Sequence, residues 1–306
     1  MVPPDAADVD AAGWSCRMPQ RRDWQNRRFQ DALRELGLWQ GEATPEARHD
    51  WEKAASLLVL RADGQLRSER VGLFVAAGVD PLYAVVSREV RQVLVTDRYL
   101  GEWPSSPSDF GRRPAAYLKV AAAWDRIDIA RMDGRSLGLA DARFDFVVCI
   151  GPSLTWFGDR AGAVAGLAEI ARVLRPGGLA VLTFEFDVRV DRLDRGFRFS
   201  GRPARAAEWY ARTADSVLGR GRRMLHLRSA GDVAALLRSG GLEAIARIDP
   251  TLGDLLGSVP NTGWLKYHTP SSSGPDLLRA RKGMAGGPFS PWASSILLLA
   301  CRPRAT

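Results

Sequence analysis

The sequence predicts an α/β fold in which helices cover both faces of a mostly parallel sheet. Three short apolar runs rich in Val, Ile and Phe, at residues 127–130, 144–150 and 179–184, are bounded by turn or charged residues, as buried strands are. Between the last two runs, residues 159–174 place apolar side chains at the spacing of a helix. A strand, a helix and a strand of these lengths form a parallel crossover unit, the building block of such a sheet.

The same patterns predict the remaining elements. Further strands are expected at residues 71–75, 93–97, 242–248 and 295–301, which makes a seven-stranded sheet closed by an antiparallel last strand. Helices are expected at residues 20–37, 44–60, 81–88, 113–124, 203–218 and 229–239. We therefore expect a loose tail at 1–13, an N-terminal helical extension at 14–68, and an α/β domain at 69–306 that includes a long loop at 249–292.

Length and composition narrow the class of protein. The 306 residues suffice for one large domain with appendages, and no apolar run approaches the ~20 residues that span a bilayer. Residues 1–10 lack the basic and apolar regions of a secretory signal, and the three cysteines have no metal-site spacing. These features predict a cytoplasmic protein with reduced thiols, no membrane association and no metal.

The charge is unevenly distributed along the chain. Residues 1–186 hold 24 Lys and Arg against 25 Asp and Glu, a net of −1, whereas residues 187–306 hold 19 against 10, a net of +9. The basic part could attract an anionic substrate or nucleic acid, or it could simply form a solvated face. Aromatic residues do not alternate with the arginines as a base-stacking surface would require, so we do not expect nucleic acid.

Three motifs accompany the predicted strands in a fixed order. Asp133-Gly134 follows the strand at 127–130, Phe144-Asp145 opens the next strand, and Leu-Arg-Pro-Gly-Gly at 174–178 precedes the strand at 179–184. In this order the motifs resemble the second half of the class I S-adenosylmethionine-dependent methyltransferases. The resemblance extends over residues 70–186. It implies a Rossmann-like sheet, S-adenosylmethionine as the cofactor and S-adenosylhomocysteine as its product, without a metal.

The resemblance places the cofactor at the ends of four predicted strands. The loop after the first strand is glycine-rich in the family, whereas here Ala76 stands at the first glycine position and Gly78 remains. Asp97 could accept hydrogen bonds from both ribose hydroxyls, or only cap the next turn. Asp133 would bind the adenine amino group, or only form a turn. The expected cofactor-binding residues are Val75, Ala76, Ala77, Gly78, Asp80, Asp97, Arg98, Met132, Asp133, Gly134, Ile150 and Gly151.

A methyl acceptor is expected beside the loop at 151–158, which follows the fourth strand. Related methyltransferases often carry a Glu-His pair where this chain has Thr155-Trp156, so we do not expect a base in this loop. The catalytic candidates are Glu185, at the end of the fifth strand, and His268, in the long loop, although either could be structural instead. The expected substrate-binding residues are Ser153, Trp156, Phe157 and Tyr267.

Together these features predict a methyltransferase that acts on a small molecule by O- or N-methylation, as in specialised metabolism. The basic part favours an anionic acceptor, and a homodimer is compatible with the sequence. Two alternatives stay open. The altered first loop and the missing Glu-His pair would suit a protein of this fold that transfers no methyl group, either a repurposed enzyme or a non-catalytic partner. The basic part alone would suit an RNA methyltransferase.

Overall fold

The computed structural model describes residues 13–14, 16–39, 48–101, 106–150, 157, 159–187, 227, 229–249 and 293–303. Of the predicted elements, the helix at 203–218, nearly all of the tail and nearly all of the loop at 249–292 lie outside these residues. The predicted division of the chain into tail, helical extension and α/β domain stays a prediction.

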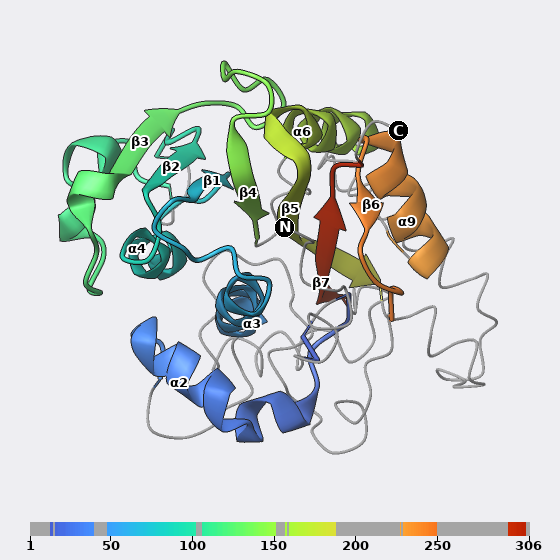
Figure 1. Cartoon of the computed structure of the whole chain (residues 1–306), viewed down its shortest axis with the longest axis horizontal. Helices are drawn as coiled ribbons and strands as arrows, with labels where there is room; N and C mark the ends of the chain where they lie inside the picture. The colour runs from blue at the N-terminus through green and yellow to red at the C-terminus, as the bar shows by residue number, and fades with distance from the viewer. Residues whose placement is uncertain are drawn as a thin grey trace, which may run out of the picture.

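Seven strands form one sheet in the order β3-β2-β1-β4-β5-β7-β6 (Figure 1). Neighbouring strands among β1 to β5 are parallel, whereas β7 runs antiparallel to both β5 and β6. The strands are β1 Val71–Val75, β2 Gln92–Asp97, β3 Ile127–Arg131, β4 Phe144–Cys149, β5 Leu174–Asp187, β6 Glu243–Ala244 and β7 Ala293–Cys301. The predicted fold, a Rossmann-like and mostly parallel sheet with an antiparallel last strand, is confirmed.

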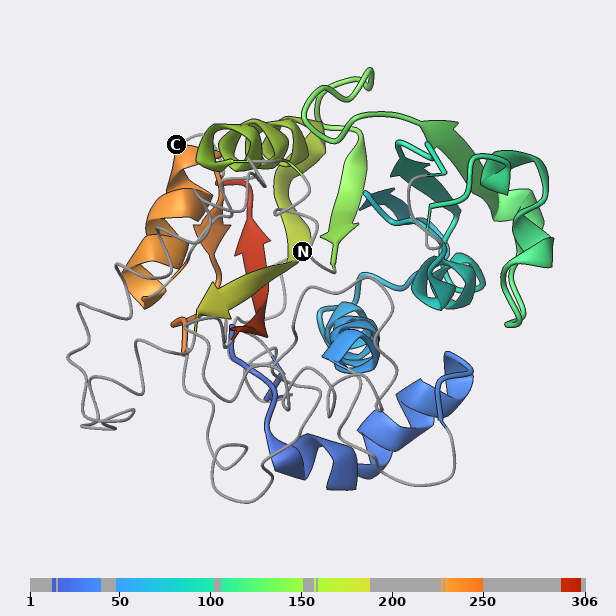
Figure 2. The same ribbon diagram turned by 180° about the vertical axis from the view of Figure 1, so that it is seen from behind.

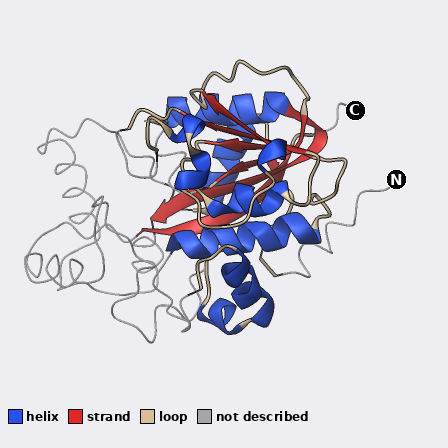
Figure 3. Ribbon diagram, turned by 90° about the vertical axis from the view of Figure 1, so that its left-hand side faces the viewer, coloured by secondary structure: helices blue, strands red, loops and turns tan. Residues whose placement is uncertain are grey.

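Helices cover both faces of the sheet. The crossover from β1 to β2 contains α4 (Pro81–Ser87), and the crossover from β4 to β5 contains α6 (Arg160–Val173). These two crossovers step in opposite directions across the sheet, so right-handed connections place α4 and α6 on opposite faces. α3 (Arg48–Ala62) packs beside α4, and α9 (Ala230–Ser239) packs beside α6. Figure 2 shows α6 and α9 together, and the edge-on view of Figure 3 shows helices on both sides of the strands.

The predicted helix at 20–37 is divided in two. A short 3-10 helix, η1 (Arg21–Gln25), is followed by α2 (Arg27–Glu35). The break falls at Asn26, whose extended backbone (φ −75°, ψ 123°) lets its side chain accept a hydrogen bond from the N–H of Phe29 at 3.3 Å. Asn favours this capping position over a helix interior because its side chain competes for backbone donors.

The predicted helix at 113–124 is wrong. The chain forms three single 3-10 turns instead, η2 (Phe110–Arg112), η3 (Pro114–Ala116) and η4 (Trp124–Arg126). Proline disfavours helical geometry in the residue before it, and Arg113 accordingly has φ −140° and ψ 52°. The turns also bury Phe110, whose ring stacks on that of Tyr99 with centroids 5.2 Å apart.

The last strands also differ from the prediction. The strand predicted at 242–248 is reduced to Glu243–Ala244. β5 is longer than its apolar run, because the antiparallel ladder with β7 continues to the pair Asp187–Ala293. The ladder between β4 and β5 shifts register: Phe144 pairs with Leu174, but Phe146 pairs with Leu179. The extra residues of β5, at 175–178, lie between these two pairs.

Asp145 explains the Phe-Asp motif at the start of β4. Its buried carboxylate accepts the N–H of Val71 at 2.8 Å, where β1 begins. It also accepts hydrogen bonds from Arg70 at 3.0 Å and from Arg175 at 2.5 Å. One buried charge therefore joins the starts of β1, β4 and β5, and these ionic bonds compensate for its removal from water.

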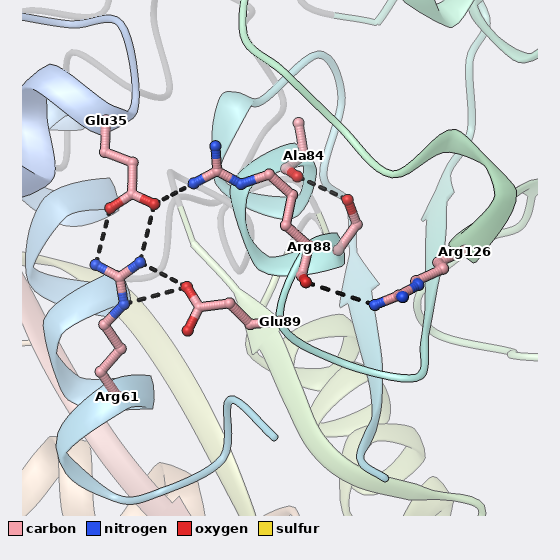
Figure 4. Close-up of polar contacts among 7 residues, drawn as sticks. Glu35, Arg61, Ala84, Arg88, Glu89 and Arg126 are labelled. Atoms are coloured by element: carbon pink, nitrogen blue, oxygen red, sulfur yellow. Dashed lines mark hydrogen bonds and ion pairs between the residues drawn. The ribbon is translucent and has the colours of Figure 1, made fainter. Parts of the chain in front are cut away.

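An ion-pair network fixes the N-terminal helices to the sheet domain (Figure 4). Arg61 of α3 binds Glu35 of α2 through two hydrogen bonds of 2.8 and 2.9 Å. It also binds Glu89, just after α4, at 2.5 Å, while Arg88 donates to Glu35. The network therefore connects three helices through four side chains.

Phe157 packs between glycines of two elements. A Cβ built on Gly134, in the turn after β3, would lie 2.8 Å from the Phe157 ring, and one on Gly166 of α6 would lie 2.3 Å from it. Only 5% of Phe157 is exposed. The absence of a Cβ at Gly134 and Gly166 thus allows this ring to lie directly against the backbone of both elements.

We expect Glu35→Ala to lower the free energy of unfolding by about 1 kcal/mol, because it removes the shared acceptor of Arg61 and Arg88 in a partly solvated network. Asp31→Ala is the matched control on the same helix, since Asp31 pairs only with the exposed Arg34 among the described residues. We expect it to cost less than about 0.5 kcal/mol. Urea unfolding checks both values, and equal losses would contradict a stabilising network.

Gly134→Ala should destabilise the protein by about 1–3 kcal/mol, because the new methyl group would overlap the Phe157 ring and a methyl group of Val75. Gly138→Ala, four residues further on, is the control, since a Cβ there meets no atom within 4 Å. The control should be neutral or slightly stabilising. If Gly134→Ala proves as stable as the control, Phe157 is not tightly packed against this turn. Thermal unfolding followed by circular dichroism measures both.

Candidate functional site

The predicted cofactor residues follow strands whose carboxyl ends share one edge of the sheet. Val75 ends β1, Asp97 ends β2, and Met132 directly follows β3. The backbone joins these ends further, since the N–H of Met132 donates to the carbonyl of Asp97 at 2.9 Å. In open parallel sheets, ligands bind at this edge, where the strand order reverses. Here the reversal lies between β1 and β4.

The loop after β1 keeps a left-handed backbone in spite of its alanine. Ala76 has φ +52° and Gly78 has φ +55°, and the N–H of Ala77 donates to the carbonyl of Thr96 at 3.1 Å. A left-handed alanine costs roughly 1–2 kcal/mol, so the surrounding contacts must hold it in place. At the first glycine position of the family, this chain therefore carries a methyl group on a left-handed backbone that glycine would adopt without strain.

Asp97 connects the loop after β1 to the loop after β2. One carboxylate oxygen, Oδ2, accepts the N–H of Gly78 at 2.9 Å. The other, Oδ1, accepts the N–H of Tyr99 at 3.1 Å and the hydroxyl of Ser106 at 2.7 Å. A carboxylate offers about four acceptor positions. The described residues occupy three of them, which leaves room on Oδ2 for one ligand hydroxyl.

Two buried tyrosines form hydrogen bonds to the carbonyl of Gly78 in the same loop. The hydroxyls of Tyr83 and Tyr99 both donate to the carbonyl of Gly78 at 3.3 Å. Burial raises the pKa of both phenols above the ordinary value, so both stay protonated and able to donate. The peptide groups around Gly78 are therefore fixed by side chains from α4 and from the loop after β2.

Asp133 is engaged by an arginine two residues further on. The backbone N–H and Nε of Arg135 donate to Oδ1 at 2.9 and 3.0 Å, and its Nη2 donates to Oδ2 at 2.6 Å. These bonds to Arg135 hold the pKa of Asp133 below its usual range, with a smaller contribution from the charge of Arg98. The pair is partly solvated, so the carboxylate stays ionised and keeps an acceptor position on Oδ2.

Asp80 has a structural role at the start of α4. Its side chain accepts the N–H of Leu82 at 2.8 Å, as a helix N-cap, and the residue is 9% exposed. Burial raises the pKa of its carboxyl group, and the charges of Lys53 and His49 oppose that rise. These residues belong to α3, so the start of α3 approaches the loop that follows β1.

The predicted substrate and catalytic residues are only partly described. Phe157 lies in the core against two glycines, so its ring offers little surface to an acceptor. The backbone of Glu185 pairs with Ser295 in the ladder of β5 and β7. Ile150, which directly follows β4, is half-buried. The predicted residues Gly151, Ser153, Trp156, Tyr267 and His268 lie outside the described residues.

Sequence reasoning missed several residues that shape the site. Ser106 and Arg135 bind the two predicted acids, and Tyr83 holds the carbonyl of Gly78. Arg135 could have been suspected, because a cation two residues after an Asp-Gly turn can reach back to the Asp carboxylate. Ser106 had no such signal, since its contact depends on how the loop after β2 folds back.

Within the described ranges, no three His, Cys, Asp or Glu side chains gather as metal ligands. None of the helices formed by these residues is long and apolar enough to cross a membrane.

Comparisons with known proteins bear on the middle of the chain. A family model described as a methyltransferase domain matches residues 108–182, which include β3, β4, α6 and the start of β5. No curated protein matches the chain.

Several solved structures match the chain at low similarity. A putative methyltransferase of Haloferax volcanii, solved in complex with the activator Trm112, is 14% identical, with 91% of this chain and 97% of that chain covered and a TM-score of 0.48. The magnesium protoporphyrin IX methyltransferase of Synechocystis, solved with bound S-adenosylhomocysteine, is also 14% identical, with coverages of 92% and 97% and a TM-score of 0.46. The YcgJ protein of Bacillus subtilis is 16% identical, with coverages of 82% and 99% and a TM-score of 0.46.

At these identities and TM-scores the solved structures do not bear on what this chain binds. The family match and the strand order carry the conclusion instead. Residues 108–182 match a methyltransferase domain. The sheet that contains them has five parallel strands, β1 to β5, and β7 pairs antiparallel with β5. The resemblance of this chain to the class I S-adenosylmethionine-dependent methyltransferases is confirmed.

Proposed function

We propose that this protein transfers a methyl group from S-adenosylmethionine to the oxygen or nitrogen of a small organic acceptor. The observation that carries the proposal is the placement of two carboxyl groups, Asp97 and Asp133, at the ends of neighbouring strands, each with an acceptor position left on Oδ2. A nucleoside offers matching donors, the ribose hydroxyls and the adenine amino group. The excess of basic residues at 187–306 favours an anionic acceptor.

Different residues at this edge of the sheet would bind different parts of the cofactor. Asp97 would accept a ribose hydroxyl, Asp133 the adenine amino group, and the backbone from Val75 to Gly78 would lie along the amino-acid part of the cofactor. The bound cofactor supplies a methyl group that its sulfonium already activates. The protein then mainly has to hold donor and acceptor in line and exclude water.

Two alternatives follow from particular residues. A protein of this fold that transfers no methyl group is favoured by Ala76 in the first loop and by the engagement of Asp133 with Arg135. An RNA methyltransferase is favoured only by the basic residues at 187–306. Binding of RNA that weakens steeply with salt would support the second alternative.

Isothermal titration with S-adenosylmethionine and S-adenosylhomocysteine tests the proposal, after any ligand carried through purification has been removed. We expect micromolar dissociation constants for both. Asp97→Asn should weaken binding by about tenfold or more, because a hydrogen bond to a carboxylate is worth more than one to a neutral amide. Asp128→Asn is the control, since this exposed carboxylate on β3 only accepts a hydrogen bond from Gln92 among the described residues.

The outcomes separate the proposals. No binding by the folded wild-type protein would favour the alternative without methyl transfer. Equal affinities for wild type and Asp97→Asn would show that the cofactor does not use this carboxylate. Circular dichroism is needed beside the titration, because Asp97 also holds the N–H groups of Gly78 and Tyr99.

Arg135→Ala should bind S-adenosylhomocysteine more tightly, by up to about fivefold, because a partly exposed ion pair that competes for Asp133 is worth at most about 1 kcal/mol. The pKa of Asp133 should also return toward its ordinary value, so affinity should begin to fall at a higher pH when the solution is acidified. Arg131→Ala, an exposed arginine at the end of β3, is the control. Weaker binding by Arg135→Ala would contradict the competition and indicate that Arg135 itself contacts the ligand.

A further inference from the structure

The N-terminal end of α3 carries a histidine held by a buried carboxylate. Nδ1 of His49 lies 2.8 Å from Oε2 of Glu52, one helical turn further along. The Glu52 side chain is 1% exposed, whereas that of His49 is 32% exposed. A carboxylate removed from water requires donors or a cation beside it. Glu52 therefore holds the ring of His49 through Nδ1, and its oxygen accepts a hydrogen bond in the tautomer that carries the proton on Nδ1.

Other charged groups gather around this pair. Burial raises the pKa of Asp50, while the charges of Lys53 and His49 oppose that rise and those of Asp80 and Glu52 add to it. Burial also raises the pKa of Asp80, in the loop before α4. The charges of Lys53 and His49 oppose this rise, and the charge of Glu52 adds to it. Among the described residues, the ionisable groups near His49 include Asp50, Glu52 and Lys53 on its own helix, and Asp80 before the neighbouring one.

The position of this cluster relates it to the proposed site. Asp80 closes the loop that follows β1, and Gly78 of the same loop is bound by Asp97. α3 packs against α4, β5 and β7, and Figures 1 and 2 show it below the arrowhead of β4. The start of α3 therefore lies at the edge of the sheet where parallel strands present their carboxyl ends to ligands.

An acceptor hydroxyl must lose its proton when it is methylated, and a protonated amine must lose one before its lone pair can attack the methyl carbon. The loop after β4, at residues 151–158, contains no titratable side chain, so a base must come from another part of the chain. His49 has the chemistry for this role, because an imidazole nitrogen can accept a proton and a partner carboxylate stabilises the imidazolium that forms.

We propose that His49, oriented by Glu52, is the base that takes the proton of the methyl acceptor. This inference rests on the proposed methyl transfer. The acceptor oxygen or nitrogen forms a bond to the methyl carbon, the bond from that carbon to sulfur breaks with its electron pair remaining on sulfur, and the acceptor proton passes to Nε2 of His49. The proton then leaves to water. Glu52 is a positioning residue, since it acts through His49.

Chemical modification tests the position of His49 without knowledge of the acceptor. Diethyl pyrocarbonate acylates accessible neutral imidazoles, and peptide mass spectrometry resolves the three histidines of the chain, His49, His226 and His268. Saturating S-adenosylhomocysteine should slow the modification of His49 at least threefold and leave His226 unchanged. Protection of His268 alone would overturn the proposal in favour of the base predicted from sequence.

The same experiment distinguishes failure of this inference from failure of the proposed function. If titration calorimetry shows that S-adenosylhomocysteine binds but the modification rate of His49 is unchanged, His49 does not face the site. If S-adenosylhomocysteine does not bind, the proposed methyl transfer fails first, and the base assignment fails with it.

Variants test the role in proton transfer. S-adenosylhomocysteine production is measured with catechol, 4-nitrophenol and a primary amine as probe acceptors. For any probe that the wild type methylates, His49→Gln should lower kcat about 100-fold at neutral pH, leave KM within a few-fold and remove the rise of kcat with pH. Glu52→Gln, which can still bond to the ring, should retain more activity than Glu52→Ala. Wild-type kcat in His49→Gln would overturn the proposal, and if no probe is methylated, the modification experiment decides.

Discussion

The proposed site depends on the hydrogen bonds that the Asp97 carboxylate accepts from two loops. The N–H of Gly78 comes from the loop after β1 and the N–H of Tyr99 from the loop after β2, so a single charge fixes both at the end of its own strand. Hydrogen bonds to a carboxylate are stronger than neutral ones, and the hydroxyls of Tyr83 and Tyr99 secure the carbonyl of Gly78 as well. Protein groups therefore hold Gly78, Tyr99 and Ser106 in place, so a ligand would not have to order these residues, which lowers the entropic cost of binding.

The same arrangement limits how the two acids can meet a ligand. Protein donors occupy three of the roughly four acceptor positions of Asp97. The three hydrogen bonds from Arg135 likewise occupy three positions of Asp133. Each can accept one further hydrogen bond without rearrangement, whereas a second bond from a ribose would require Ser106 or a backbone donor to leave. The affinity for a nucleoside is therefore set as much by what these carboxylates already bind as by their position on the sheet.

Most of the sheet could be predicted from sequence, because buried parallel strands are continuous apolar runs that end at polar residues. β1 and β4 are buried along their whole length, and their predicted bounds are correct to within one residue. The helix predicted at 113–124 was wrong: Pro114 accounts for the non-helical backbone of Arg113, and two 3-10 turns, at 114–116 and 124–126, replace the rest. The positions of Asp97 and Asp133 at strand ends were predictable for the same reason as the strands. Ser106, the side-chain partner of Asp97, was not predictable, because it reaches this carboxylate only through the tertiary fold, and the same holds for Tyr83 on the carbonyl of Gly78.

The N-terminal helix α3 places ionisable side chains beside the proposed site that the strand ends do not provide. In the proposed function, the strand ends would supply backbone groups and two acids for a nucleoside, whereas the sequence of the loop after β4, at 151–158, contains no titratable side chain. α3 brings His49, Glu52 and Lys53 to this edge, and its other end is bound to α2 and α4 through Arg61. A helix fixed at one end by ion pairs and at the other by packing beside Asp80 holds its side chains at a defined distance from the loop after β1. The charged network of Figure 4 and the histidine pair thus lie on one rigid element, so disturbance of the network should reach the site through the position of α3.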